Sequence, residues 1–167
     1  MQKNETASQQ FLSFALGDEV FAVNVLQVKE ILDVINITRV PQMPEYMLGV
    51  INLRGSVVPV IDLRRKFGMK KGEKHQDNCI VVLEIDFDSE RVVIGALTDA
   101  VREVLDLAAD QIEPPPRMGM KLRSEFIRGM GKQGESFIII LDIDKIFSSD
   151  ELCVIGSVEG AEPASVN

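Results

Sequence analysis

Tryptophan is missing from the 167 residues of this chain, histidine and tyrosine each occur once, and cysteine occurs twice. The two cysteines, Cys79 and Cys153, lie far apart, and each sits in an apolar run. This placement favours two buried thiols over a disulfide or a metal-binding pair. The first ten residues, MQKNETASQQ, lack the apolar segment of a signal peptide. Few cysteines and no signal peptide predict a cytoplasmic protein.

The residue types that carry most enzymatic chemistry are scarce or badly spaced. His75 is the single histidine and lies in the charged segment KKGEKHQDN, without a nucleophile or an acid at a defined spacing. No serine stands in the G-x-S-x-G pattern of a hydrolase. We therefore expect no catalytic site, and a pair of carboxylates brought together by the fold is the alternative left open.

Two short motifs resemble ligand sites but favour turns. GMGKQG, residues 129–134, satisfies G-x-G-x-x-G, yet a dinucleotide site needs a helix after the glycines, and the strand-like SFIIIL follows here. EIDFDSE, residues 84–90, alternates carboxylates as a calcium loop does, but Arg91 stands where such a loop requires glycine. Both motifs are interpreted as hairpin ends, and we expect neither a cofactor nor a metal ion.

Positive charge is in deficit, and long apolar runs are absent. Eighteen Lys and Arg oppose 26 Asp and Glu, which gives a net charge of −8. No window shows the basic stripe that a phosphate backbone would attract. The longest apolar run, FIIIL at 137–141, is far too short to cross a bilayer, and no basic amphipathic helix is present. Nucleic acid binding and direct membrane insertion are therefore not expected.

Short runs rich in Val, Ile and Phe make up most of the chain. They include VFAV at 20–23, CIVVLEI at 79–85 and SFIIIL, and turn sequences such as RGS and KQGE separate them. This pattern predicts a mainly β fold of barrels or sandwiches. Helical spacing is confined to three short pieces, NVLQVKEIL, DLRRKFG and DKIFSSDELCVI. The small and polar ends, 1–9 and 156–167, are predicted to be flexible tails.

The chain contains an internal repeat. VKEILDV at 28–34 matches VREVLDL at 101–107, a shift of 73 positions. Further on, VPVIDLRRKF at 58–67 matches IIILDIDKIF at 138–147, a shift of 80 positions. We expect two similar β units, about 15–70 and about 80–145, each too small to be robust alone, that pack together and leave a groove between them.

One arginine is not explained by this repeat. Arg54, Gly55 and Ser56 separate two apolar runs in GVINLRGSVVPVIDLR, and Gly55 and Ser56 already suit a tight turn. In the second copy, Gly134 occupies the position of Arg54. Arg54 is therefore predicted to be dispensable for folding and available for binding. The alternative is an ordinary solvated arginine in a turn.

A second segment differs between the copies. ILDVINI at 31–37 is apolar on both alternating faces, whereas the second copy has Ala108 and Asp110 at the positions assigned to Ile35 and Ile37. Two interpretations are open. Either the strand is covered on both sides within the protein, or it forms an apolar patch that docks another chain.

The chain as a whole resembles the CheW-type chemotaxis coupling proteins. VKEIL, GVINLRG followed by VVPVIDLR, TDAVREVLDL and ILDIDKIF carry the resemblance, which runs from about residue 10 to 150. It implies one CheW-like domain over 10–150, mainly β and without catalytic activity. This domain would consist of two SH3-like five-stranded β-barrels, related by the repeat and packed around a shared apolar core, with a few short helices.

The resemblance also implies a function and binding residues. Such a protein would be a non-enzymatic adaptor that couples the cytoplasmic tip of chemoreceptors to the regulatory domain of the chemotaxis histidine kinase, so that receptor state controls autophosphorylation. Receptor binding would use the positions Val28, Glu30, Gly49, Asn52 and Arg54. Ile35 and Ile37 are candidates for kinase binding from the apolar pattern alone.

The resemblance implies a location, and two other functions are left open. The protein would be cytoplasmic and would associate with membrane receptor arrays through its partners, and self-association into rings is left open. A generic peptide-binding β module and a specialised adaptor of a non-flagellar chemosensory pathway are the alternative functions.

Overall fold

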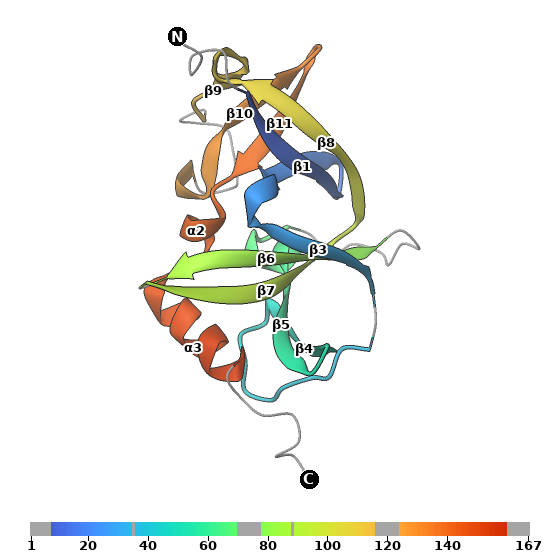
Figure 1. Ribbon diagram of the computed structural model, residues 1–167, viewed down its shortest axis with the longest axis vertical. Coiled ribbons are helices and arrows are strands. Elements are labelled where there is room, and N and C mark those ends of the chain that lie inside the picture. Colours follow the sequence, from blue (N-terminus) through green and yellow to red (C-terminus); the bar gives the residue numbers. More distant parts are fainter. Residues whose placement is uncertain (1–7, 35, 70–77, 88, 116–123, 160–167) are drawn as a thin grey trace.

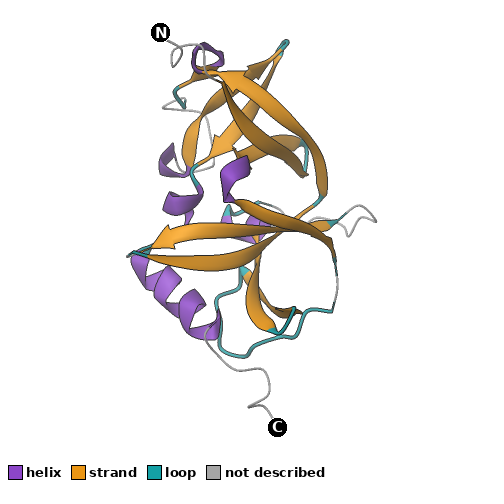
Figure 2. Cartoon of the chain, viewed as in Figure 1, coloured by secondary structure: helices purple, strands orange, loops and turns teal. Residues whose placement is uncertain are grey.

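The computed structural model describes residues 8–34, 36–69, 78–87, 89–115 and 124–159. Most of these residues form two curved β-sheets, with short helices at their edges (Figures 1 and 2). The prediction of a mainly β protein with two barrel-like units is therefore confirmed. None of the helices in these ranges is both long enough and apolar enough to span a membrane.

Each sheet takes strands from both halves of the chain. The six-stranded sheet has the order β8-β1-β2-β11-β10-β9, and the five-stranded sheet has the order β3-β6-β7-β5-β4. The first sheet contains β1 (Ser8–Leu16), β2 (Glu19–Asn24), β8 (Ala100–Ala108), β9 (Ile112–Glu113), β10 (Ile127–Gln133) and β11 (Ser136–Leu141). The second contains β3 (Val28–Asp33), β4 (Met47–Leu53), β5 (Ser56–Asp62), β6 (Cys79–Phe87) and β7 (Glu90–Thr98).

The internal repeat is confirmed, and it reveals an exchange of hairpins. VKEILDV contributes β3, at one edge of its sheet, and VREVLDL contributes β8, at the corresponding edge of the other sheet. In each sheet an antiparallel hairpin follows this edge strand, and its second strand pairs in parallel with a second hairpin. The hairpin beside β3 is β6–β7, from the second copy, whereas the hairpin beside β8 is β1–β2, from the first.

The strand registers show that the two arrangements are equivalent. In the parallel pairs Val60 lies opposite Gly95, and Ile140 lies opposite Ala22. These partners are related by the shifts of 80 and 73 positions. The predicted division into units of about 15–70 and 80–145 is therefore wrong, because each sheet combines strands of both copies.

Very short connections explain this exchange. Asp99 is the only residue between β7 and β8, and a reversal into an antiparallel neighbour needs a loop of about two residues or more. The chain consequently passes from one sheet directly into the other. The 3-10 helix η2 (Val25–Gln27) makes the corresponding passage from β2 to β3.

Apolar side chains form a shared core and two smaller barrel cores. The shared core takes Phe14 and Phe21 from one sheet and Leu83 and Ile94 from the other. The interior of the six-stranded sheet holds Phe11, Ala22, Leu107, Ile138 and Ile140. The interior of the five-stranded sheet holds Ile51, Val58, Val60, Ile80 and Val82. The shared apolar core is thus present as predicted.

The helices agree with two of the three predicted segments. DLRRKFG forms α1 (Leu63–Lys66), and DKIFSSDELCVI forms α2 (Ile143–Ile146) and the start of α3 (Ser149–Glu159). NVLQVKEIL is not a helix, because only η2 is helical there and the rest becomes β3. Two more 3-10 turns, η3 (Ala109–Gln111) and η4 (Ser124–Phe126), occur in the second half of the chain.

The ends of the ordered chain and the cysteines need small corrections. The predicted tails, 1–9 and 156–167, overlap β1, which begins at Ser8, and α3, which continues to Glu159. Both cysteines were predicted to be buried, but Cys79 is only partly buried and Cys153 is exposed on α3, because Leu152 and Ile155 form the buried face of this helix. His75 lies outside the described residues.

Candidate functional site

The β4–β5 hairpin ends in a two-residue turn with an unusual backbone. Leu53 pairs with Ser56, and the intervening Arg54 and Gly55 have φ of +52° and +88°. Positive φ at both central positions is the arrangement of a type I′ turn, which fits the twist of paired strands. The amide of Gly55 also donates to Asn52 Oδ1 at 2.8 Å.

The sequence suggested that Arg54 is neutral for folding, but its backbone conformation shows that it is not. A left-handed backbone costs a residue other than glycine about 1–2 kcal/mol. Gly134, the equivalent residue of the second copy, has φ of +63° and avoids this strain. The chain keeps an arginine at a position where glycine would be more stable, which indicates that its side chain serves a purpose other than making the turn.

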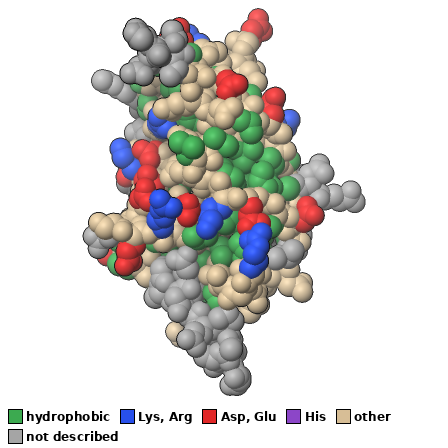
Figure 3. Space-filling view, viewed as in Figure 1, with side chains coloured by type: hydrophobic (Ala, Val, Ile, Leu, Met, Phe, Trp, Pro, Cys, Tyr) green, Lys and Arg blue, Asp and Glu red, His purple; other side chains and the backbone are tan. Residues whose placement is uncertain are grey.

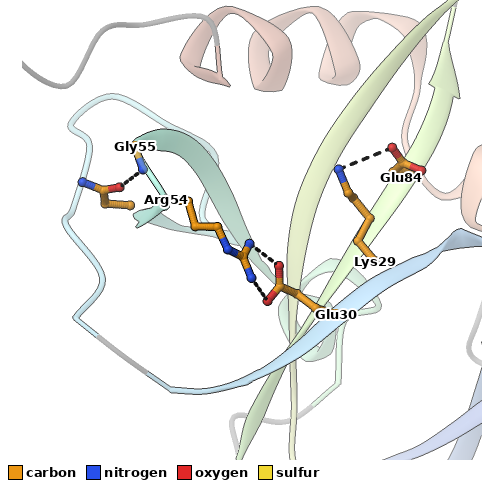
Figure 4. Close-up of polar contacts among 6 residues, drawn as sticks. Lys29, Glu30, Arg54, Gly55 and Glu84 are labelled. Atoms are coloured by element: carbon orange, nitrogen blue, oxygen red, sulfur yellow. Dashed lines mark hydrogen bonds and ion pairs between the residues drawn. The ribbon is translucent and has the colours of Figure 1, made fainter.

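The side chain of Arg54 forms a two-point ion pair with Glu30. Nη1 lies 2.6 Å from Oε2 and Nη2 lies 2.9 Å from Oε1 (Figure 4). The Arg54 side chain is 72% exposed, whereas that of Glu30 is 25% exposed. Since β3 and β4 are the two outer strands of their sheet, this pair spans the seam where the sheet curls toward closure.

The pair also sets the charge of the site. The hydrogen bonds from the Arg54 guanidinium hold the pKa of Glu30 below its ordinary value. Glu30 therefore stays ionised at any pH above this lowered pKa. The stability that its ion pair with Arg54 contributes is lost only as the pH falls through that pKa. Lys29, the neighbour of Glu30, points to Glu84 on β6, with 3.6 Å between Nζ and Oε2 (Figure 4).

A β-bulge directs Glu30 toward this seam. In the pairing of β3 with β6 the register shifts between Val28, opposite Leu83, and Glu30, opposite Val82. A regular strand would place Val28 and Glu30 on the same face. The bulge instead sets Val28 opposite Leu83 of the shared core and Glu30 opposite Val82 of the barrel interior. Val28 is partly buried against the shared core.

Gly49 has a packing role at the same seam. The segment after β3 returns to β4, where the amides of Thr38 and Val50 each donate to the other's carbonyl at 2.8 Å. Gly49 has φ of +152°, and a Cβ added to it would lie 2.2 Å from the Thr38 carbonyl oxygen. Gly49 is buried, so the structure does not bring it to the surface beside Arg54.

Ile37 lies beside Gly49 and points partly into the barrel. It packs against the core that contains Ile51 and Val58. Its counterpart is Ile112, because the pairing of Thr38 with Val50 repeats as the pairing of Glu113 with Met130. The sequence comparison of Ile37 with Asp110 is therefore wrong by two positions. Ile35 lies outside the described residues.

Exposed apolar side chains also lie on η2 and on the edge strands β3 and β8. Leu26 of η2 is 86% exposed, Ile31 of β3 is 44% exposed and Val104 of β8 is 49% exposed. Figure 3 shows hydrophobic side chains gathered over η2 and the adjoining part of β8, above a row of charged side chains. Sequence analysis missed Leu26 because the NVLQVKEIL spacing resembled a helix, in which its exposure could not be inferred.

Within the parts of the chain that the structure describes, no group of three or more His, Cys, Asp or Glu side chains could hold a metal ion. The site instead combines one charged fork, an amide-bearing turn and exposed apolar side chains. Such a combination suits the recognition of another protein surface.

Comparison with known proteins assigns the fold to a family. A family model described as a CheW-like domain matches residues 10–151. The chain belongs to this family. It is 39% identical over 154 residues to "Chemotaxis protein CheW" of Klebsiella aerogenes, an alignment that covers 92% of this chain and 90% of that protein. It is 35% identical over 149 residues to "Chemotaxis protein CheW" of Helicobacter pylori, covering 89% and 87%.

A solved structure shows the same fold. The scaffolding protein TtCheW from Thermoanaerobacter tengcongensis superposes with a TM-score of 0.76 at 33% identity, and covers 86% of this chain and 95% of its own. The CheW-like domain of this chain therefore includes both sheets. It also includes the turn at Arg54 and the seam between β3 and β4.

Proposed function

We propose that this protein is a non-enzymatic adaptor of bacterial chemotaxis signalling, which couples chemoreceptors to the chemotaxis histidine kinase. The match of a CheW-like domain over residues 10–151 carries the proposal. The adaptor would act in the cytoplasm and reach membrane receptor arrays through its partners. Receptor state would then control kinase autophosphorylation because the two proteins are held together.

The receptor contact is proposed at the exposed turn that carries Arg54. Its guanidinium has five N–H donors, of which two go to Glu30, so the others can reach a partner. Asn52 is exposed on the same hairpin, and Val28 borders the shared core. A helical receptor tip with carboxylate, amide or carbonyl acceptors beside an apolar stripe would complement this surface. Gly49 would support it by positioning the chain beneath.

Replacing Arg54 tests this contact. Arg54→Ala should weaken binding of a receptor hairpin fragment by about ten-fold or more, because charge-assisted hydrogen bonds of about 1.5–3 kcal/mol are lost. Receptor control of kinase autophosphorylation should be lost with it, while kinase binding persists. The measurements are titration with the fragment at moderate salt and a kinase assay with and without receptor.

Arg54→Gly is the matched variant that separates binding from folding. Glycine removes the backbone strain at φ of +52°, so this variant should unfold at a temperature equal to or above that of Arg54→Ala. It should still lose receptor binding by the same factor. Unchanged receptor affinity in both variants would mean that Arg54 is a solvated turn residue.

The kinase contact is proposed on the apolar segment that includes Ile35 and Ile37. Ile31 and Val34, which precede it, are 44% and 45% exposed and extend the apolar surface. Ile37→Asp should weaken kinase binding ten-fold or more, since an ionised group in a desolvated contact costs about 2–4 kcal/mol. Binding to the receptor fragment should survive. Pull-down or titration with the kinase regulatory domain measures the effect.

Ile112→Asp is the control for this prediction, because Ile112 packs into the second barrel as Ile37 packs into the first. Both variants should lose similar stability in thermal unfolding. Kinase binding should fall only in Ile37→Asp. An equal loss of kinase binding in the two variants would assign Ile37 to the barrel interior alone.

One co-sedimentation experiment distinguishes the proposed adaptor function from two other functions. Purified protein should bring the histidine kinase down with receptor-containing membranes, and omission of the adaptor should abolish this co-sedimentation. Binding to isolated peptides without either partner would favour a generic peptide-binding module. Partners from a non-flagellar chemosensory pathway would favour a specialised adaptor, and defined rings of the protein alone would show self-association.

A further inference from the structure

Both sheets are joined across the two halves of the chain. The first half comprises residues 8–34 and 36–69, and the second comprises 78–87, 89–115 and 124–159. Four strand pairs join one half to the other, namely β1 with β8, β2 with β11, β3 with β6 and β5 with β7. Neither half forms a complete sheet with its own strands, because each sheet needs a hairpin from the other half.

The most buried ion pairs also cross between the halves. Arg64 of α1 pairs with Asp99, and the two side chains are 16% and 14% exposed. Lys66 of α1 pairs with Glu151 of α3, with Nζ 2.8 Å and 3.0 Å from the two carboxylate oxygens. Polar groups so far from solvent are expensive to leave unpaired, so each half alone would expose an unfavourable surface.

Aromatic side chains surround one of these pairs. Lys66 Nζ lies 4.9 Å from the ring centre of Tyr46, 5.4 Å from that of Phe147 and 5.7 Å from that of Phe126. Tyr46 belongs to the first half, whereas both phenylalanines belong to the second. The cation site is thus assembled only when the halves meet.

We propose that each half of the chain can also bind the complementary half of a second copy of this chain. It would do so through the same surface that it presents to its own partner half. Two chains would then exchange halves and form a dimer made of two complete CheW-like domains. Every strand pair and ion pair named above would be reproduced between the chains. Because the backbone passes from the first half to the second only once, between Met69 and Asn78, the exchange alters one connection.

The physical basis is the balance between identical contacts and association entropy. Within each domain of the dimer the buried area and the hydrogen bonds are those of the monomer. The difference is the loss of translational freedom, which concentration compensates. Exchange requires the halves to separate, so it should occur during refolding and not by simple mixing of folded monomers.

Complementation between two full-length variants tests the exchange. Val60→Asp damages the first half and Ile140→Asp damages the second, at equivalent and fully buried positions of the two parallel strand pairs. Each variant refolded alone should lack a cooperative thermal transition. Refolded together at high concentration, they should form a dimer in which one of the two domains is intact, and regain up to half of the wild-type transition amplitude.

A second pair of variants serves as control. Ile51→Asp also damages the first half, at a residue that is 2% exposed. Refolding Val60→Asp with Ile51→Asp should recover nothing, because no exchange combines two intact halves. Recovery in this control pair, or the absence of recovery in the first pair, would overturn the proposal.

The wild-type protein supplies an independent measurement. Refolding from denaturant at high protein concentration should yield a dimer in size-exclusion chromatography, whereas refolding at high dilution should yield a monomer. The unfolding temperature of the dimer should rise with protein concentration, whereas that of the monomer should not, since their internal contacts are the same and only association differs. A monomer alone under both conditions would also contradict the exchange, and neither result depends on the adaptor function.

Discussion

Asp99→Ala should lower the free energy of unfolding by about 3–5 kcal/mol. The substitution removes a carboxylate that pairs with the guanidinium of Arg64, and this guanidinium is largely shielded from solvent. Asp99 is the single residue between β7 and β8, and it also accepts the Gly17 amide, with 2.6 Å between N and Oδ2. It therefore ties α1 and the β1–β2 turn to the point where the chain changes sheets. Denaturant unfolding measures the loss.

The expected thermal shift is correspondingly large. For a domain of this size each kcal/mol lowers the melting temperature by about 2–4 °C, which predicts a decrease on the order of 10 °C. Glu113→Ala is the matched control, because its ion pair with Lys132 is 46% and 49% exposed. An exposed pair contributes about 0–1 kcal/mol. Equal effects of the two substitutions would show that burial does not strengthen the Arg64 and Asp99 pair.

Gly49→Ala should destabilise the seam between β3 and β4 by about 3 kcal/mol or more, because two backbone hydrogen bonds would be broken. The new Cβ would lie 2.2 Å from the Thr38 oxygen and 2.9 Å from Ile37 Cγ2. The Thr38 carbonyl belongs to the backbone and cannot move without releasing Val50. Hydrogen exchange at the Thr38 and Val50 amides should accelerate more than at amides of the six-stranded sheet.

Gly55→Ala provides the comparison for this effect. Gly55 has φ of +88°, but nothing lies within 4 Å of a Cβ placed there. Only backbone strain remains, which costs about 1–2 kcal/mol. Native protection of Thr38 and Val50 in Gly49→Ala would contradict the close packing at this seam. If the protection is lost, any fall in receptor or kinase binding would reflect displacement of the segment around Ile37.

The β class, the repeat and the turns could be predicted from local pattern. Alternating and continuous apolar runs indicate strands because they suit half-buried and buried faces, and turn residues between them mark hairpins. GMGKQG and EIDFDSE were correctly interpreted in this way, since they lie in the β10–β11 and β6–β7 hairpins. The likeness of 28–34 to 101–107 was sufficient to predict corresponding positions for the two segments, although the first of them had been expected to be partly helical.

The sites were predicted less completely, for reasons of geometry. Arg54 was singled out by its mismatch with Gly134, but its positive φ and its ion pair with Glu30 depend on how the sheet curls. Gly49 stood in an apolar run, where a glycine signals close approach without naming the neighbour. The counterpart of Ile37 was misassigned because the shift between the copies changes within a loop.

The amino-acid sequence by itself determined most of the strand segments, their occurrence in two copies and the presence of Arg54 in only one of these copies. The tertiary structure alone decided which hairpin completes which sheet. Both hairpins present the same apolar pattern, so either could pair with either copy on local grounds. The choice depends on the single-residue connection at Asp99 and on ion pairs such as Arg64 with Asp99, which form only when distant segments are packed together.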